Sequence, residues 1–365
     1  MRGNMRIIVY LIVSLFFEFT AVVHANAQQK SDRKPVDGYM VFGNIIARSS
    51  TWDASADRNN FIVNQVGGAV NKPVTPSMQA LAQAGFYSKD DSYKPMLALA
   101  FVRFSKCFLP RTQLYIGRKR LDFGKVNLRC PRNWDYTDRH AVLKSFFGDT
   151  SVIGNGVAAE YMLPTSLSIR ATLGAWYVNS QQSSSGQSGK NAKEDPLAIK
   201  TSGVENEVFS GCIRLLFPFN YENSLELGIN GISGFGTHHS YQKDRVSVAG
   251  IDFTYERKRK DRRFIYVQGE LYQLRRELTV ETIDRMGFYL YGGLRITEQW
   301  EFGVRHDWTE TALLDKNELS GTLWNITRII TPHSKLRLQH YYDWKHEEHT
   351  AYAQVVFGVG TMFSQ

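Results

Sequence analysis

The densest group of potential metal ligands is the His-Glu-Glu-His run at residues 346–349. A zinc-binding HExxH motif holds two histidines four residues apart on a helix, with a glutamate as general base between them. Here the histidines are three residues apart and no helical pattern surrounds them. Because loops collect polar residues, we interpret this run, and the pair His238 and His239, as solvated loops. We expect no metal and no other cofactor.

A nucleophilic enzyme needs a serine or cysteine held beside a histidine and an acid. The sequence has no G-x-S-x-G elbow, which would expose a nucleophilic serine on a sharp turn. Cys107, Cys130 and Cys212 are an odd number of cysteines spread far apart, which gives no disulfide scaffold, and at most one pair can form. We therefore expect that the protein is not an enzyme. A barrel enzyme acting on lipid remains an alternative, because serine and histidine are plentiful.

The strongest charge cluster is the run Arg257-Lys258-Arg259-Lys260-Asp261-Arg262-Arg263. It joins two alternating segments, 246–255 and 264–272, and so falls at the tip of a hairpin. Such runs are usually solvated or contact anionic head groups. We expect no nucleic-acid partner.

The N-terminus indicates export. Arg2 and Arg6 precede an apolar stretch at 7–17, and Ala25-Asn26-Ala27 has the small-x-small pattern of a signal-peptidase site. The stretch is shorter than the roughly 18 to 20 apolar residues that span a bilayer. We predict a signal peptide at 1–27, cleaved near Ala27, and a single domain at 28–365.

From residue 38 onward, segments of about ten residues alternate apolar and polar side chains, as β-strands with two different faces do. In the segment 167–177, Leu167, Ile169 and Leu173 share one face, and Arg170 and Thr172 share the other. Aromatic residues make up 13% of the chain, and 29 residues are glycine. This composition and period are typical of transmembrane barrels.

The spacing predicts an all-β fold, a closed antiparallel transmembrane barrel of about 16 strands, with 14 or 18 as alternatives. The segment near 39–47 is expected to pair with 352–363, because an unpaired edge in lipid leaves backbone groups unsatisfied. Short turns should face the periplasm, and longer loops should face the exterior. The short turns are expected at 163–166, 218–221, 297–299 and 331–334, and the longer loops near 49–60, 124–153, 179–206, 236–244, 274–285, 310–319 and 344–349.

A set of short motifs lies between residues 117 and 165: Gly117-Arg118, Phe123-Gly124-Lys125-Val126-Asn127, Trp134-Asp135-Tyr136-Thr137-Asp138, Phe146-Phe147-Gly148-Asp149, Gly154-Asn155-Gly156-Val157 and Leu163-Pro164-Thr165. This stretch resembles a largely uncharacterised family of porin-like outer-membrane barrels of Gram-negative bacteria, distantly similar to the phosphate-selective porins. The resemblance implies a long loop that folds into the pore. The chain departs from the family pattern at 129–133, which lacks its histidines, and at His140, where the family has proline.

The loop at about 124–153 carries more large apolar groups than a solvated loop would. Trp134, Tyr136, Phe146 and Phe147 are expected to anchor it inside the barrel, because burying each side chain is worth roughly 1.5 to 3 kcal/mol. Its charged residues would then stand at a constriction, where low-dielectric walls strengthen their effect on ions. The constriction candidates are Arg129, Arg132, Trp134, Asp135, Tyr136, Asp138 and Arg139.

Six arginines fall on the polar phase of their strands and are candidates for the pore lining: Arg103, Arg170, Arg214, Arg295, Arg305 and Arg337. Guanidinium groups in a lumen attract anions. The same phase also carries Glu160, Glu226, Asp252, Glu270, Glu301, Asp307 and Asp343, so we expect most of the arginines to be paired with carboxylates across strands. With arginines and carboxylates both facing the lumen, the channel could have a mild preference for anions.

These features predict an outer-membrane, porin-like channel for passive diffusion of small hydrophilic solutes or ions. The expected partners are outer-membrane lipid, those solutes and the barrel-assembly machinery, and a homotrimer is a candidate assembly. A surface-exposed binding or adhesion protein is a further alternative, because the loop at 179–206 is long and of low complexity.

Overall fold

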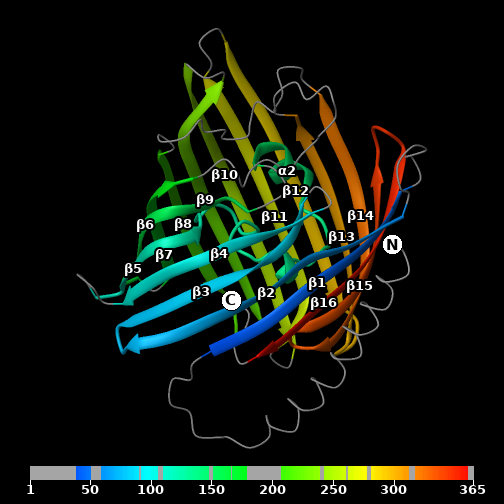
Figure 1. Cartoon of the computed structure of the whole chain (residues 1–365), viewed down its shortest axis with the longest axis horizontal. Coiled ribbons are helices and arrows are strands. Elements are labelled where there is room, and N and C mark those ends of the chain that lie inside the picture. The colour runs from blue at the N-terminus through cyan, green and yellow to red at the C-terminus, as the bar shows by residue number, and fades with distance from the viewer. Residues whose placement is uncertain are drawn as a thin grey trace, which may run out of the picture.

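Sixteen β-strands form one closed antiparallel barrel in the computed structural model, and each strand pairs with its neighbours in sequence (Figure 1). The structure describes residues 38–50, 59–89, 92–105, 110–147, 151–165, 167–178, 207–238, 242–259, 262–277, 281–311 and 317–360. The expected signal peptide at 1–27 lies outside these residues. The strands are β1 (Gly38–Ser50), β2 (Asn59–Thr75), β3 (Met78–Lys89), β4 (Ser92–Ser105), β5 (Thr112–Arg120), β6 (Ile153–Met162), β7 (Ser168–Tyr177), β8 (Glu207–Pro218), β9 (Asn223–His238), β10 (Gln242–Arg259), β11 (Arg262–Glu277), β12 (Thr282–Arg295), β13 (Trp300–Glu310), β14 (Glu318–Thr331), β15 (Ser334–Asp343) and β16 (Glu348–Gly360).

The first and last strands close the barrel. β1 pairs antiparallel with β16 from Met40 opposite Gly360 to Ser50 opposite Thr350. The predicted closure is therefore confirmed over the described residues. A closed sheet has no edge, so its backbone donors and acceptors are paired even where lipid surrounds it.

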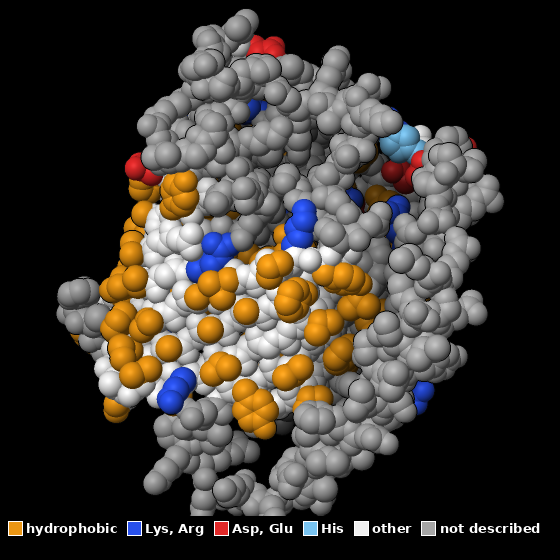
Figure 2. All heavy atoms as spheres, in the orientation of Figure 1, with side chains coloured by type: hydrophobic (Ala, Val, Ile, Leu, Met, Phe, Trp, Pro, Cys, Tyr) orange, Lys and Arg blue, Asp and Glu red, His pale blue; other side chains and the backbone are white. Residues whose placement is uncertain are grey.

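The two faces of the wall differ in polarity. Apolar side chains point outward, among them Leu173, Ile229 and Leu338, which are 71%, 63% and 53% exposed. Inward neighbours are polar and buried, such as Thr172 and Gln339. Figure 2 shows hydrophobic side chains spread over the outer wall with few charged ones among them. This is the predicted phase, and it is the pattern of a lipid-facing barrel.

The wall is uneven in height. β5 and β6 have nine and ten residues, whereas β10 has 18. The segment that joins β5 to β6, residues 121–152, turns into the barrel over this low wall (Figure 1). We call it the inserted segment; its residues 148–150 are outside the described part of the chain.

The inserted segment contains a 3-10 turn, η1 (Pro131–Asn133), and a short helix, α2 (Ala141–Phe147). Neither helix among the described residues is long and apolar enough to cross a membrane. The base of the segment is closed by Asn127, whose side-chain nitrogen donates to the carbonyls of Leu121 (2.9 Å) and Val152 (3.2 Å) and whose oxygen accepts from the Val152 amide (2.7 Å). The Asn127 side chain therefore holds the two ends of the inserted segment, Leu121 and Val152, together.

Candidate pore constriction

The first part of the inserted segment is bound to the wall by carboxylates. Glu270 of β11 accepts hydrogen bonds from the backbone amides of Lys125 (2.7 Å) and Val126 (3.0 Å). The Lys125 ammonium forms ion pairs with Glu226 of β9 at 2.7 Å and with Asp252 of β10 at 3.6 Å. Three neighbouring strands thus hold one short stretch of the segment.

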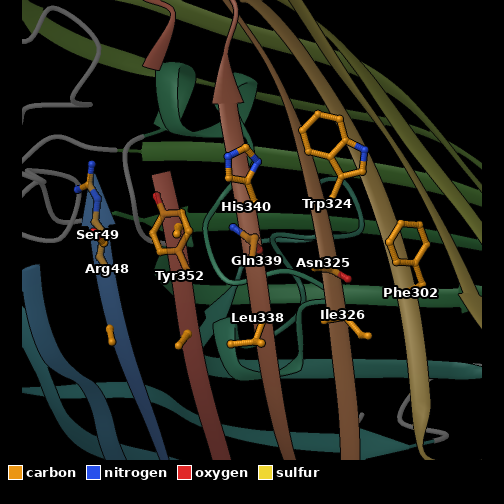
Figure 3. Close-up of a pocket in the computed structure, with 13 residues that line it drawn as sticks. Arg48, Ser49, Phe302, Trp324, Asn325, Ile326, Leu338, Gln339, His340 and Tyr352 are labelled. Atoms are coloured by element: carbon orange, nitrogen blue, oxygen red, sulfur yellow. The ribbon is translucent and has the colours of Figure 1, made fainter. Parts of the chain in front are cut away.

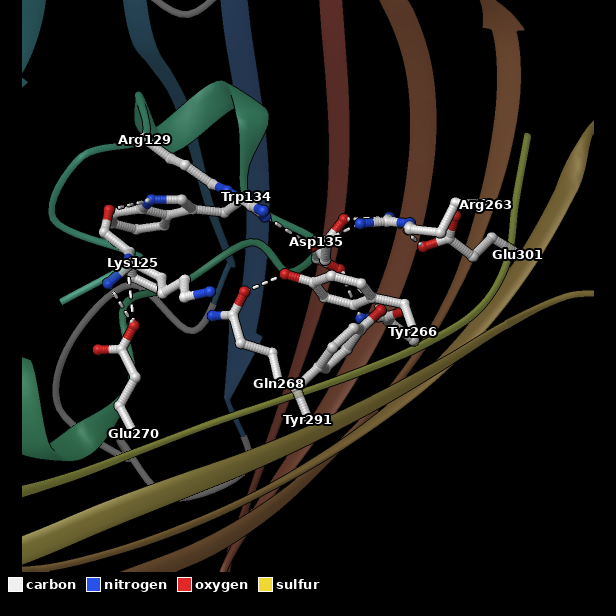
Figure 4. Close-up of polar contacts among 12 residues, drawn as sticks. Lys125, Arg129, Trp134, Asp135, Arg263, Tyr266, Gln268, Glu270, Tyr291 and Glu301 are labelled. Atoms are coloured by element: carbon white, nitrogen blue, oxygen red, sulfur yellow. Dashed lines mark hydrogen bonds and ion pairs between the residues drawn. The ribbon is translucent and has the colours of Figure 1, made fainter. Parts of the chain in front are cut away.

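Asp135 is the centre of a buried charge cluster (Figure 4). Its carboxylate is 2.6 Å from the Arg263 guanidinium of β11 and 3.2 Å from that of Arg129. Arg263 also contacts Glu301 of β13 at 3.2 Å. Burial alone raises the pKa of Asp135, but the guanidiniums of Arg263 and Arg129 outweigh it and hold that pKa well below its ordinary value. Asp135 is therefore an anion under any physiological condition.

Backbone carbonyls of the segment accept hydrogen bonds from the opposite wall. The Trp134 carbonyl accepts from Lys335 (2.8 Å) and Arg337 (3.0 Å), both on β15. The Asp135 carbonyl accepts from Asn325 of β14 (2.9 Å). Because these donors belong to strands remote from β5 and β6, the segment crosses the whole lumen.

The next residues of the segment continue this attachment. Thr137 donates its backbone amide to Gln339 (2.8 Å) and its hydroxyl to Gln354 of β16 (3.3 Å). The Asp138 carboxylate contacts Arg305 of β13 at 3.4 Å. Polar side chains of β13 to β16 therefore fix the backbone on both sides of Tyr136.

Residues 130 and 132 reach the first strands of the barrel. The Arg132 guanidinium lies over the Phe42 ring of β1, 3.7 Å from its centroid. The Cys130 sulfur is 3.9 Å from the side-chain oxygen of Gln65 on β2 and 3.7 Å from the side-chain nitrogen of Gln83 on β3. Both Cys130 and Cys212 are free thiols.

Aromatic packing fills the space between these polar contacts. Trp134, Tyr136, Phe146 and Phe147 are all buried, the last two on α2. His140 is stacked on Tyr289 of β12 with 3.7 Å between ring centroids. Burial, with Arg305 and Arg139 nearby, lowers the pKa of His140 well below its ordinary value, so this ring is neutral. The centre of the lumen is thus a packed core and not open water.

The structure places the six wall arginines in different environments. Four contact carboxylates: Arg170 with Glu160 at 3.9 Å, Arg214 with Glu226 at 3.8 Å, Arg295 with Glu301 at 3.5 Å and Arg305 with Asp307 at 2.8 Å. Arg337 donates to neutral oxygens of Thr327, Gln354 and Trp134. Arg103 donates to Gln79. Among the constriction candidates, Arg139 is buried and lies next to His140, two residues before α2 begins.

A cavity of about 820 Å³ lies below the inserted segment, at the short-turn end of the barrel. Its lining includes the turn at 331–333 and the charged cluster around Asp135. Six cationic side chains line it against four carboxylates, so the balance is positive: Arg129, Arg132, Arg263, Arg295, Lys335 and Arg337 against Asp135, Glu256, Glu298 and Glu301. Among the described residues, no group of three or more histidine, cysteine or acidic side chains is arranged to hold a metal ion.

Several residues of this site were not among the candidate site residues, although Glu270 was expected to face inward. Arg263, Glu270, Asn325, Lys335 and Gln339 bind the segment from the wall. All but Arg263 lie within alternating strands, where the inward phase was the available signal. Arg263 was assigned to a solvated hairpin tip, and the structure corrects this: it is the first inward residue of β11 and is bound to Asp135.

Comparison with solved structures gives the fold. The anion-selective porin from Comamonas acidovorans superposes with a TM-score of 0.59 at 10% identity, covering 89% of this chain and 99% of that chain. A loop L8 deletion mutant of OmpT, an outer membrane protein of Vibrio cholerae, gives 0.57 at 10% identity, with coverage of 89% and 99%. The outer membrane channel DcaP of Acinetobacter baumannii gives 0.55 at 9% identity, with coverage of 89% and 96%.

Sequence comparison adds little to this. No protein-family profile matches the chain. An uncharacterized protein of Aquifex aeolicus (strain VF5) is 24% identical over 259 residues, which are 62% of this chain and 52% of that protein. The chain thus spans about half the length of this relative. On its closed wall of 16 antiparallel strands and on these superpositions, the chain has the fold of the outer-membrane porins.

Proposed function

We propose that this protein is an outer-membrane channel for passive diffusion of small hydrophilic solutes or ions, in which the inserted segment forms the constriction. The observation that carries the proposal is the segment itself. It crosses the lumen and is bound to the inward side chains of β8 to β16 and of β1 to β3, while the outer wall is apolar. A solute in this barrel meets the segment and the polar wall around it.

The packed centre of the lumen favours small solutes. Trp134, Tyr136 and α2 occupy the space that an unobstructed barrel of 16 strands would leave to water. The positive balance around the cavity below the segment supports a mild anion preference, because a lumen of one sign concentrates ions of the other. The superposition with an anion-selective porin agrees with this preference.

We propose no enzymatic activity, and the bilayer experiment below would reveal a lipid-hydrolysing enzyme if there were one. A homotrimer is proposed as the assembly, since one of the superposed structures, OmpT of Vibrio cholerae folded in vitro, is described as a trimer form. Insertion by the barrel-assembly machinery, export through a leader at 1–27 and cleavage near Ala27 complete the proposal.

Reconstitution into planar bilayers tests the function. Discrete conductance steps are expected in potassium chloride, with a reversal potential on the anion side. Replacing Arg129 and Arg132 with glutamine should shift that potential toward cations, because both line the cavity. The matched control is Arg275→Gln with Arg328→Gln, which also removes two charges but at exposed positions outside the cavity lining. A silent bilayer with hydrolysed phospholipid would instead identify a lipid enzyme.

A further inference from the structure

The six cations around the cavity below the inserted segment fall into two groups. Three of them form ion pairs with Asp135 or Glu301 on the side of β11 to β13, and these are Arg129, Arg263 and Arg295. The other three, Arg132, Lys335 and Arg337, have no ion-pair partner among the residues that the structure describes. The unpaired positive charge therefore lies on the side of the cavity that β15, β16 and β1 form.

Strand alternation turns two of these unpaired cations inward on β15. Figure 3 shows Leu338, Gln339 and His340 in succession along this strand. Gln339 faces the lumen, because it accepts a hydrogen bond from a backbone amide of the inserted segment. Lys335 and Arg337 precede Gln339 at intervals of two residues and so share its face.

Lys335 lies between apolar neighbours. In the strand register it is opposite Ile329 of β14 and opposite Val356 of β16, and both of these residues line the cavity. Its ammonium donates to the Trp134 carbonyl at 2.8 Å, which uses one of its three N–H groups. The remaining donors of Lys335 thus stand beside hydrocarbon on both neighbouring strands.

The Arg132 guanidinium lies on the other side of the same end of β16. It covers the Phe42 ring of β1, which is opposite Gly358 in the strand register, and its Nη2 is 3.5 Å from the sulfur of Met40. Nη1 of Arg132 and Oγ of Ser334 are buried without a hydrogen-bond partner among the described residues, and both side chains belong to the cavity lining. This side of the cavity therefore carries hydrogen-bond donors that lack an acceptor.

We propose that this side of the cavity binds a small organic carboxylate. The carboxylate group contacts Lys335 and Arg132, and the apolar part of the molecule lies against Ile329, Val356 and Met40. A carboxylate supplies the charged acceptor that the donors lack. The hydrocarbon around them favours an apolar body over a fully hydrated anion such as inorganic phosphate. This inference rests on the proposed function, since it names the class of solute that the channel takes.

Equilibrium binding to the full barrel in neutral detergent, measured by isothermal titration calorimetry, tests the site. Benzoate is compared with acetate, which has the same charged group and almost no apolar part. Benzoate is expected to bind about tenfold more tightly, because it buries more hydrocarbon. Lys335→Met should weaken benzoate binding about tenfold, since a hydrogen bond to a charged group is lost. Lys72→Met, at an exposed position of β2 outside the cavity lining, is the matched control and should bind as wild type does.

A second variant keeps every charge of the cavity. Ile329→Thr replaces part of the apolar lining and should reduce the preference for benzoate over acetate, while acetate binding stays as in wild type. Heat-modifiable migration on gels checks that each variant is folded. Equal benzoate affinity in folded wild type, Lys335→Met and Ile329→Thr would overturn the proposal. Tighter binding of inorganic phosphate than of benzoate would also overturn it.

Conductance of the same preparations in planar bilayers separates this inference from the proposed function. Benzoate binding by a barrel that shows no conductance steps would contradict the channel and leave the carboxylate site standing. Conductance steps from a barrel that binds no benzoate would contradict the carboxylate site and leave the channel standing.

Discussion

At the scale of single residues, Asp135 is a charged attachment of the inserted segment to the wall. It joins Arg129 of the segment to Arg263 of the wall inside a buried cluster. Asp135→Asn keeps the shape but leaves both guanidiniums without this carboxylate. Removing one partner of a buried ion pair costs about 3 to 5 kcal/mol, so we expect a loss of this order in the free energy of unfolding in urea.

The pH dependence of this variant provides its control. The folded-state pKa of Asp135 lies well below the ordinary 3.8, so its contribution is present above that value and is lost as the pH falls below it. The difference in unfolding free energy between wild type and Asp135→Asn should therefore be constant from neutral pH down to about 5 and shrink in more acidic solution. A difference that stays constant at acidic pH would show that the Asp135 charge is not what holds the segment.

Leu173 tests the assignment of the lipid face. It is the most exposed of the large apolar side chains in the strands, at 71%, and lies near the middle of β7. Leu173→Arg should cost about 2 to 4 kcal/mol in lipid, because a charge near the bilayer midplane is destabilising. Phe219→Arg, in the exposed turn after β8, should cost about 0 to 1 kcal/mol, as charges near the interface do. Equal costs at both positions in urea titrations would place the apolar band elsewhere.

At the scale of elements, the hydrogen bonds of Asn127 should allow most of the inserted segment to be deleted while the barrel wall stays intact. Because its side chain bridges Leu121 and Val152, residues 129–150 can be replaced by a short glycine-serine linker without separating β5 from β6. We expect single-channel conductance to rise several-fold, since the core of Trp134, Tyr136 and α2 leaves the lumen.

Folding of the deletion variant is checked by its heat-modifiable migration on gels, and its conductance is compared with that of Asn127→Ala in the full chain. If the folded deletion variant conducts as wild type does, the segment does not limit the pore, and the proposed constriction fails. A conductance that rises only in the deletion variant locates the resistance in the segment and not in the hydrogen bonds of Asn127.

For the whole molecule, barrel closure makes a covalent prediction. Ala47 and Ala353 are directly opposite each other on β1 and β16. Facing residues of an antiparallel pair have Cβ atoms about 4.5 to 5.5 Å apart, near enough for a disulfide after a small shift. Ala47→Cys with Ala353→Cys, in a chain whose native cysteines are replaced by serine, should cross-link within one chain on mild oxidation.

The control pairs Ala47→Cys with Ala82→Cys on β3, which is not adjacent to β1. Mass spectrometry of the digested protein distinguishes the cross-link. Its absence in the first variant, or an equal yield in the control, would contradict the register of the seam.

The sequence by itself determined the barrel. Period-two alternation defines two faces in each strand, and it is a local property that can be read from segments such as 167–177 without knowledge of neighbours. Closure followed from the cost of an open edge in lipid. The strand number of about 16, the short turns and the pairing of the first strand with the last were therefore predictable. The aromatic residues at 134–147 also indicated that this loop is buried inside the barrel.

Only the tertiary structure showed which residues of the barrel wall bind the inserted segment. Its partners Glu270, Lys335 and Gln339 are separated from it by more than a hundred residues and are indistinguishable in sequence from other inward polar side chains. Arg263 shows the same limit, because a basic run at a hairpin tip is solvated unless a buried carboxylate such as Asp135 reaches it. Such pairings depend on barrel height and curvature, which place the low wall of β5 and β6 opposite β13 to β16, and no local pattern encodes that geometry.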